Sequence, residues 1–396
     1  MKRILLLLLL LGAFSGQLAA RTLKSVYRVT TDAPRRDCPI VIRDLPDWAQ
    51  SAAVSADGRT IPAQLDRALG ELAFVADLDG SRDFRVTYSS KSARDLFPSR
   101  VHAQMWLKRA DKTLQAADTV SSTKDDMYHR LHHHGPAFES EYAAYRVYFD
   151  KKQTIDTYGK KHPRLELSET MWYPSEEQMA AGSGYDNLRV FGSVGVGTLK
   201  GWDSVKRKMV HITDFARREA RIVARGPVRT VVEMWVEGWR YCGREIAMTS
   251  RYILYAGHGE VQVENRIEGD FAGLLFTTGV MKMAEHRVER GEEWVAAWGR
   301  DFPENDTLKW ERERGACRGA ARRADRLARG RPDELPLPAD ARRERTDRLC
   351  VRHVLAAERV ARRVERRGVP RPADGGGAHG MQTRRGASPA LKSAHI

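Results

Sequence analysis

The residues best suited to chemistry are gathered in one short stretch of the chain. Three histidines, His132 to His134, precede a Gly-Pro pair and then Glu139. In residues 141–150, apolar side chains alternate with Tyr142, Arg146, Tyr148 and Asp150. This alternation predicts a strand with one face in the core. The other face would present aromatic rings and charges. That mixture suits a sugar-binding groove, because rings stack on pyranose faces and charged groups fix hydroxyl or carboxyl groups.

Four functions are compatible with this chemistry. A lyase that cleaves a uronide by β-elimination needs a cation at the substrate carboxylate, such as Arg146 or Lys160. It also needs a base for the C5 proton, such as one of the histidines or Tyr158. A glycoside hydrolase needs two carboxylates at a defined separation, with candidates Glu139, Asp150, Asp156, Asp203 and Glu233.

A mutarotase would instead use a histidine as acid and a carboxylate as base. A non-catalytic sugar-binding protein would depend on aromatic rings. β-Elimination is the first of these hypotheses. We expect the catalytic residues to be His133, His134, Glu139 and Tyr158. We expect substrate contacts from Arg146, Asp150, Lys160, Trp172, Tyr173, Trp202, Asp203 and His258.

Spacing along the sequence bears on two possible contacts, an ion pair between Arg146 and Asp150 and a metal site at the histidines. Arg146 and Asp150 would be about 13 Å apart along an extended strand, so we expect them not to form an ion pair. In an extended segment His132 and His134 would share a face and could bind a metal together with Glu139. Because no further ligand is placed by spacing, we predict neither a metal nor another cofactor.

The N-terminus predicts export. Residues 1–20 combine Lys2 and Arg3 with the apolar run 4–11 and a small residue at Ala20. This pattern is typical of a cleaved signal peptide, and the apolar run is too short to span a bilayer. We therefore expect a periplasmic or secreted protein that has no membrane association after cleavage.

The rest of the chain predicts an all-β protein. Residues 21–95 read as a small β-sandwich module with a hairpin turn at Asp57-Gly58. The pattern of residues 96–311 predicts many short strands, a hairpin around Gly226-Pro227 and no long amphipathic helix. They predict a large antiparallel sandwich. The polar segment 110–126 is expected to be a linker or flexible loop.

Composition separates the final 85 residues from the body. Residues 312–396 contain 21 Arg and one Lys against ten acidic residues, which is +12 of the formal net charge of +15. Lys2 and Arg3 account for two more, so the body is close to neutral. We therefore expect no nucleic-acid partner. The segment lacks aromatic residues. It is either a genuine basic, disordered tail or an out-of-frame translation of a GC-rich gene, and we favour the second interpretation.

The four cysteines show no CxxC spacing, so a zinc ribbon or redox motif is not supported. Cys38 and Cys242 fall in different modules, and we expect both to be free thiols.

Several runs in residues 21–310 resemble the bacterial family called domain of unknown function 4861. They are 133–141, 145–150, 155–160, 172–174, 195–203, 226–229 and 255–258. The resemblance implies an exported protein from polysaccharide-utilisation gene clusters, often those for pectic or other uronic-acid glycans. It also implies a β-supersandwich like that of galactose mutarotases and other aldose epimerases. Gly259 departs from the arginine expected after the Gly-His pair, and the family pattern ends at residue 311. An oligo- or polysaccharide is therefore the expected partner, while the sequence leaves the oligomeric state open.

Overall fold

The computed structural model describes residues 20–94, 96–188, 190, 194–281, 285–290, 294–300, 319–322, 348–356 and 392–393. Across these residues the protein is built from strands, and its three helices have only four or five residues each. Most strand pairs are antiparallel. The prediction of an all-β, antiparallel architecture is therefore confirmed.

The N-terminal module consists of two small sheets. One contains β1, β7, β3 and β4 together with the distant strand β27, and the other has the order β2-β6-β5. Buried side chains between them, including Ile40, Phe74 and Phe84, form a separate apolar core. The predicted turn at Asp57-Gly58 connects β3 to β4, with a positive φ at both residues. The strands are β1 (Thr22–Thr30), β2 (Arg35–Ile42), β3 (Ser51–Ala56), β4 (Arg59–Ile61), β5 (Ala63–Asp66), β6 (Glu71–Leu78) and β7 (Ser81–Ser89).

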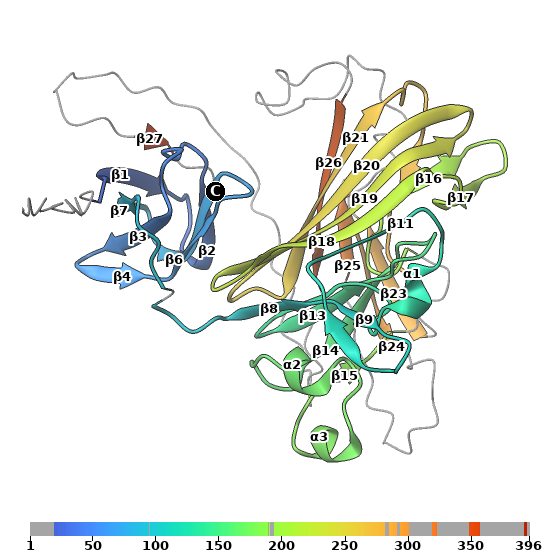
Figure 1. The fold of residues 1–396 in the computed structure, drawn as a ribbon, viewed down its shortest axis with the longest axis horizontal. Helices are drawn as coiled ribbons and strands as arrows, with labels where there is room; N and C mark the ends of the chain where they lie inside the picture. The colour runs from blue at the N-terminus through green and yellow to red at the C-terminus, as the bar shows by residue number, and fades with distance from the viewer. Residues whose placement is uncertain are drawn as a thin grey trace, which may run out of the picture.

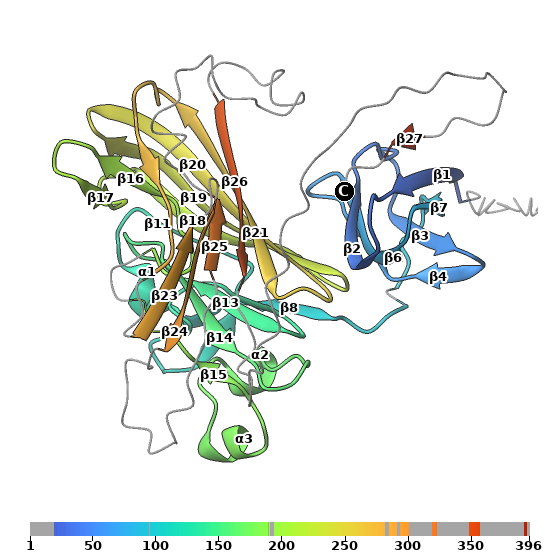
Figure 2. The same ribbon diagram turned by 180° about the vertical axis from the view of Figure 1, so that it is seen from behind.

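The body is a sandwich of two main sheets (Figures 1 and 2). The six-stranded sheet has the order β11-β18-β19-β20-β21-β26, and the five-stranded sheet has the order β15-β14-β13-β12-β8. The body strands are β8 (Val101–Gln104), β9 (Trp106–Lys108), β10 (Leu114–Ala116), β11 (Thr119–Ser122), β12 (Ala137–Ser140), β13 (Ala143–Val147), β14 (Ile155–Gly159), β15 (Tyr185–Asp186), β16 (Lys200–Asp203), β17 (Lys208–Val210), β18 (Arg217–Arg225), β19 (Arg229–Tyr241), β20 (Arg244–Tyr255), β21 (Glu260–Gly269), β22 (Phe276–Thr277), β23 (Glu285–Arg290) and β24 (Trp294–Arg300). The helices are α1 (Met127–Arg130), α2 (Leu167–Thr170) and α3 (Glu176–Ala180).

Alternation along the strands explains how the two sheets meet. In β19, Val232 and Met234 point inward, and in β13 Tyr145 and Val147 do the same from the opposite sheet. Burying a side chain of this size contributes about 1.5–3 kcal/mol, so the paired apolar faces hold the sheets together. The opposite face of the five-stranded sheet is consequently available for polar residues.

The sequence predicted a hairpin at Gly226-Pro227 and a linker at 110–126, and the structure confirms only the hairpin. The hairpin around Gly226-Pro227 joins β18 to β19 as predicted. The linker expected at 110–126 is wrong, because the segment contains β10 and β11. β11 pairs with β18 at the edge of the six-stranded sheet, and Val120 enters the core.

Of the Arg-rich tail, the structure describes three strands, β25 (Gly319–Arg322), β26 (Arg348–Ala356) and β27 (Lys392–Ser393). β26 pairs with β21 from Glu260 to Glu268. The rest of the tail and the expected signal peptide, up to residue 19, lie outside the described residues. Cys38 and Cys242 are free thiols, as predicted. Within the described ranges, no helix is both long and apolar enough to cross a bilayer.

Candidate functional site

The polar side chains gather on the outer face of the five-stranded sheet. Because Tyr145 and Val147 enter the core from β13, Ala144 and Arg146 lie on the opposite face. α2 and α3 lie on this side of the sheet, away from the six-stranded sheet (Figure 1). Leu167 of α2 packs there against Ala144. The predicted division into an apolar and a polar face is therefore confirmed within β13, where Arg146 lies on the polar face. The strand ends at Val147, so Tyr148 and Asp150 lie beyond it, and Tyr148 also packs in the core.

Arg146 occupies the centre of this face and is only 4% exposed. The β13–β14 register places it opposite Asp156. Its Nη2 donates to Oδ2 of both Asp156 (2.7 Å) and Asp186 (2.8 Å), and its Nε donates to Asp156 (2.9 Å). As expected, Arg146 does not pair with Asp150. One guanidinium thus joins two carboxylates that are 30 residues apart in the sequence.

Three aromatic side chains surround the guanidinium. Its carbon lies 4.6 Å from the ring centroid of Trp172 and 4.8 Å from that of Tyr148, within the range of cation–π contacts. The Tyr148 hydroxyl donates to Asp156 (2.8 Å), and Trp172 Nε1 donates to Asp186 (3.1 Å). The Tyr173 hydroxyl accepts from Arg146 Nη1 (2.8 Å). Tyr173 is 48% exposed, so its ring is accessible from outside the protein.

The two carboxyl groups differ in environment. Asp156 is fully buried and accepts from Arg146, from Tyr148 and from the backbone N–H of Thr157. Burial raises the pKa of Asp156, and these donors oppose that effect by favouring the charged form. The side chain of Asp186 is 24% exposed. Its low-dielectric surroundings and the charge of Asp156 raise the pKa of Asp186 to about 7, against the opposing effect of Arg146. When the pair of Asp156 and Asp186 takes up a proton near neutral pH, we therefore assign that proton to Asp186.

A glycine brings Asp186 close to the sheet. β15 pairs with β14, placing Asp186 beside Tyr158. A Cβ on the nearby Gly184 would lie 1.8 Å from the carbonyl oxygen of Gly159 and 2.7 Å from Cε1 of Tyr158. Only a residue without a side chain permits this approach.

The three histidines form a turn and not a strand. His132 to His134 follow α1, and His134 has a positive φ of 61°. The expectation that His132 and His134 share the face of a strand is therefore wrong, because the chain bends where Gly135-Pro136 begins the next segment.

All three imidazoles are held neutral at neutral pH. Burial lowers the pKa of His132, and a backbone contact with Met171 partly opposes this effect. Burial and neighbouring cations lower the pKa of His133 far below its usual value. Burial lowers the pKa of His134 to about 4. His134 also stacks on Tyr128 with ring centroids 4.1 Å apart. His132 stands edge-on to Tyr173 at 5.6 Å.

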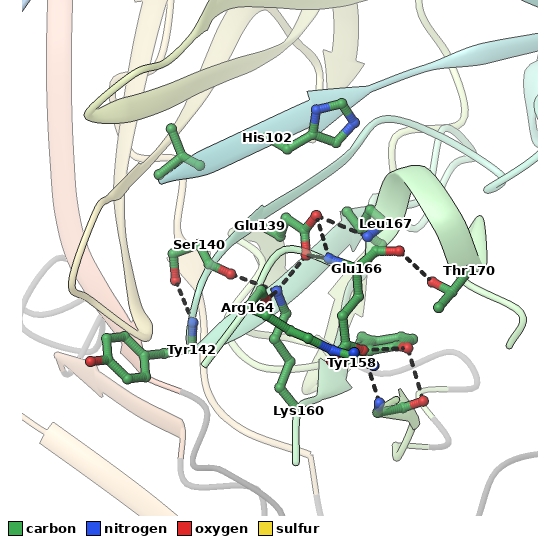
Figure 3. A network of polar contacts seen from close by, with 12 residues as sticks. His102, Glu139, Ser140, Tyr142, Tyr158, Lys160, Arg164, Glu166, Leu167 and Thr170 are labelled. Atoms are coloured by element: carbon green, nitrogen blue, oxygen red, sulfur yellow. Dashed lines mark hydrogen bonds and ion pairs between the residues drawn. The ribbon is translucent and has the colours of Figure 1, made fainter. Parts of the chain in front are cut away.

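Glu139 and Lys160 form a buried ion pair whose side chains are 0% and 1% exposed. Figure 3 shows that this pair holds the segment before α2. The carboxylate accepts from the backbone N–H groups of Glu166 (2.9 and 3.0 Å) and Leu167 (2.8 Å). Lys160 Nζ also donates to the carbonyl oxygens of Ser140 and Arg164, both at 2.6 Å. The charged groups of Glu139 and Lys160 are thus paired with each other and hydrogen-bonded to the backbone of the protein.

The anchored segment leads directly to the aromatic residues of the site. After α2, Met171 and Trp172 have φ values of 50° and 73°. Left-handed conformations of residues other than glycine cost energy and persist only where the surroundings enforce them. Tyr158 belongs to the same support, since its buried hydroxyl donates to Glu166 (2.9 Å) and burial raises its pKa above the usual range.

The remaining predicted site residues lie on other elements. Asp150 caps the turn between β13 and β14 by accepting from the N–H groups of Lys152 and Gln153. Trp202 and Asp203 belong to β16, in a separate sheet with β17 and β22. His258 follows β20 and binds Glu260 and the carbonyl oxygen of Asp37 in the N-terminal module (2.7 Å). The structure therefore brings Arg146, Trp172, Tyr173 and the three histidines together. The other four predicted residues, Asp150, Trp202, Asp203 and His258, lie elsewhere.

Asp186 and Gln104 are the site residues that sequence reasoning missed. Asp186 lies in a two-residue strand with no periodic pattern, and Gln104 lies in a four-residue strand. In the sequence, the polar residues around Gly184 are the one sign that this segment has a particular role.

Among the described residues, no group of three or more His, Cys, Asp or Glu is arranged to hold a metal ion. A model of the family described as domain of unknown function 4861 matches residues 33–311. That match ends immediately before the Arg-rich tail. No curated protein matches the chain.

Proposed function

The chain belongs to the family described as domain of unknown function 4861, whose description carries no activity, and we propose one from the site itself. We propose that the protein acts on a carbohydrate by transferring protons between the carboxyl group of Asp186 and a neutral imidazole. The observation that carries this proposal is the pair of carboxylates on one nitrogen of Arg146, of which one is buried and one is partly exposed.

This arrangement suits a general acid. A catalytic acid works best when its pKa lies near the working pH. In this site Arg146 fixes the position of Asp186, while burial and, after it, the negative charge of Asp156 raise the pKa of Asp186 to about 7. Two carboxyl groups this close cannot both ionise freely, so the pKa of one of them is raised. Half of the Asp186 side chains would therefore carry a proton at neutral pH.

His132 is the best-placed base. Its ring is edge-on to the exposed Tyr173, whose hydroxyl shares Arg146 with Asp186. Because burial keeps the imidazole neutral, it retains a lone pair that can accept a proton. A pyranose stacked on Tyr173 would therefore meet a carboxyl group and an imidazole.

The reaction that needs only these two groups is anomer interconversion. Asp186 protonates the ring oxygen of the sugar, and His132 removes the proton of the anomeric hydroxyl. The bond between C1 and the ring oxygen breaks, and a C1 carbonyl forms. After rotation about the C1–C2 bond, the reverse transfers close the ring as the other anomer, so protons and electrons balance.

The other expected reactions make greater demands. β-Elimination from a uronide needs a cation for the substrate carboxylate, but Arg146 and Lys160 are both bonded to buried carboxylates. For hydrolysis, Asp156 and Asp186 have Oδ2 atoms no more than about 5.5 Å apart, which excludes the wider separation of an inverting pair. The Oδ2 atom of Asp156, however, already accepts from Arg146 and Tyr148, and its Oδ1 accepts from the N–H of Thr157, so this carboxylate is not free to act as a nucleophile.

One experiment separates these reactions. Freshly dissolved α-anomers of glucose, galactose and galacturonic acid are followed by polarimetry and by NMR of the anomeric protons. We expect the protein to accelerate equilibration, and Asp186→Asn to abolish that acceleration. Asp83→Asn, in the N-terminal module, is the matched control. Oligogalacturonides are incubated in parallel, and an unsaturated product or new reducing ends without accelerated equilibration would refute the proposal.

The cellular setting is proposed with it. We propose that the protein is exported through residues 1–20 and meets oligo- or polysaccharides in the periplasm or outside the cell. N-terminal sequencing of the mature protein tests this, with cleavage after Ala20 as the expected result.

A further inference from the structure

The side-chain amide of Gln104 fixes the protons of its neighbours. Its Nε2 donates to the carbonyl oxygen of Leu167 (2.9 Å), so the amide cannot be turned the other way without two oxygens facing each other. Its Oε1 then accepts from His102 Nε2 (3.1 Å). The orientation of Gln104 follows from these two contacts.

That orientation determines the tautomer of His133. Gln104 Nε2 lies 2.9 Å from His133 Nε2, and because the amide nitrogen can only donate, His133 Nε2 must accept. A neutral imidazole that accepts at one nitrogen carries its proton on the other. His133 is fully buried, and burial and the charge of Arg146 keep it neutral. Its proton is therefore on Nδ1.

The Nδ1–H group has no acceptor in the part of the chain that the structure describes. Among the described residues, His132 Nε2 and Trp106 Nε1 are also buried without a hydrogen-bond partner. The rings of His132 and His133 are 4.8 Å apart, and His132 N–H donates to the carbonyl oxygen of Trp106 (2.9 Å). Buried polar groups are almost always hydrogen-bonded, so the Nδ1–H group of His133 calls for an acceptor oxygen.

We propose that His133 is a hydrogen-bond donor to an uncharged oxygen of the sugar, and not the base that the sequence predicted. This inference deepens the proposed function and rests on it. The position lies next to His132, which contacts Tyr173, so the oxygen would belong to a sugar bound at that ring. A neutral imidazole can polarise a carbonyl or hydroxyl oxygen without giving up a proton. His132 and Asp186 would then move the protons while His133 holds the substrate.

The first test needs no substrate. Long-range proton–nitrogen NMR of the protein labelled with ¹⁵N-histidine reports the tautomer of each ring. We expect His133 to be the neutral Nδ1–H form from about pH 5 to 8, where an ordinary histidine titrates. Finding the Nε2–H form, or protonation within that range, would overturn the inference whatever reaction the protein catalyses.

The second test adds a ligand. On saturation with galactose or glucose, we expect the Nδ1 proton resonance of His133 to move downfield. His133→Phe should raise KM or Kd about tenfold, the usual effect of one lost hydrogen bond, while His133→Gln restores most of the affinity. An unchanged Nδ1 resonance in the saturated protein would mean that internal water is the acceptor, and would end the inference. Sugar binding that shifts Nδ1 but gives no accelerated equilibration would support His133 as a donor and refute the proposed reaction.

Discussion

The buried pair of Glu139 and Lys160 gives the sharpest prediction about stability. Both side chains are essentially inaccessible, and the carboxylate also fixes the backbone of Glu166 and Leu167. Lys160→Met would leave a fully buried carboxylate without its cation. Removing one partner of a buried ion pair costs about 3–5 kcal/mol, and we expect a loss of that size in the free energy of unfolding.

Urea unfolding followed by tryptophan fluorescence measures this loss. The matched control is Arg28→Met, because Arg28 and Asp83 form an exposed pair in the N-terminal module, and that change should fall within experimental scatter. The double variant Glu139→Gln, Lys160→Met removes both charges and should recover most of the stability, as expected for coupled neighbours.

The prediction separates an anchor from a substrate contact. If Lys160→Met were no more destabilising than Arg28→Met, but weakened sugar binding, the anchoring role would be refuted. Lys160 would then bind substrate, as the sequence suggested.

Three further outcomes follow from the site and its surroundings. Asp186→Asn should lower the rate about 10²- to 10⁴-fold, as expected for a lost general acid, and should remove the decline of the wild-type rate above pH 7; an unchanged pH–rate profile would contradict this. His258 binds acceptors at both ring nitrogens, and although burial opposes the charged ring, the carboxylate of Glu260 raises its pKa above 6.5. Its contribution to stability should be complete below pH 6.5 and fade as the pH rises through the raised pKa, so thermal unfolding of wild type and His258→Gln should converge at alkaline pH. Gly184→Ala should cost about 1–3 kcal/mol through overpacking and reduce activity, whereas Gly279→Ala, whose Cβ would meet nothing closer than 4.0 Å, should have little effect on urea unfolding.

The strands were predictable because alternation records burial directly. Residues 229–237 and 141–150 each have one apolar face, and the structure places those faces in the core. The same pattern correctly put Arg146 on the polar face. Sequence spacing also excluded a pair between Arg146 and Asp150, since an extended chain keeps them apart.

The partners of Arg146 and Lys160 could not be predicted in the same way. Arg146 meets Asp186 across 40 residues, and Lys160 meets Glu139 across 21. Such contacts depend on strand register and on where a loop returns to the sheet, which no local pattern reveals. The sequence therefore grouped the correct chemical types, but it assigned Glu139 to catalysis and Lys160 to substrate binding, whereas both side chains are paired within the protein.

The histidines show a second limit. Read as a strand, His132 and His134 would act together. In the turn, each ring has a different neighbour, and His133 is closest to the sheet through Gln104. A turn of three identical residues gives no periodic signal from which those separate environments could be inferred.

The central claim is that Asp186 carries a proton that exchanges near neutral pH. A ¹³C NMR titration of the aspartate carboxyl carbons tests it directly, with Asp186→Asn used to assign the resonance. We predict a midpoint at about pH 7. A midpoint near the ordinary aspartate value of about 4 would contradict the account, because Asp186 would then have no proton to give.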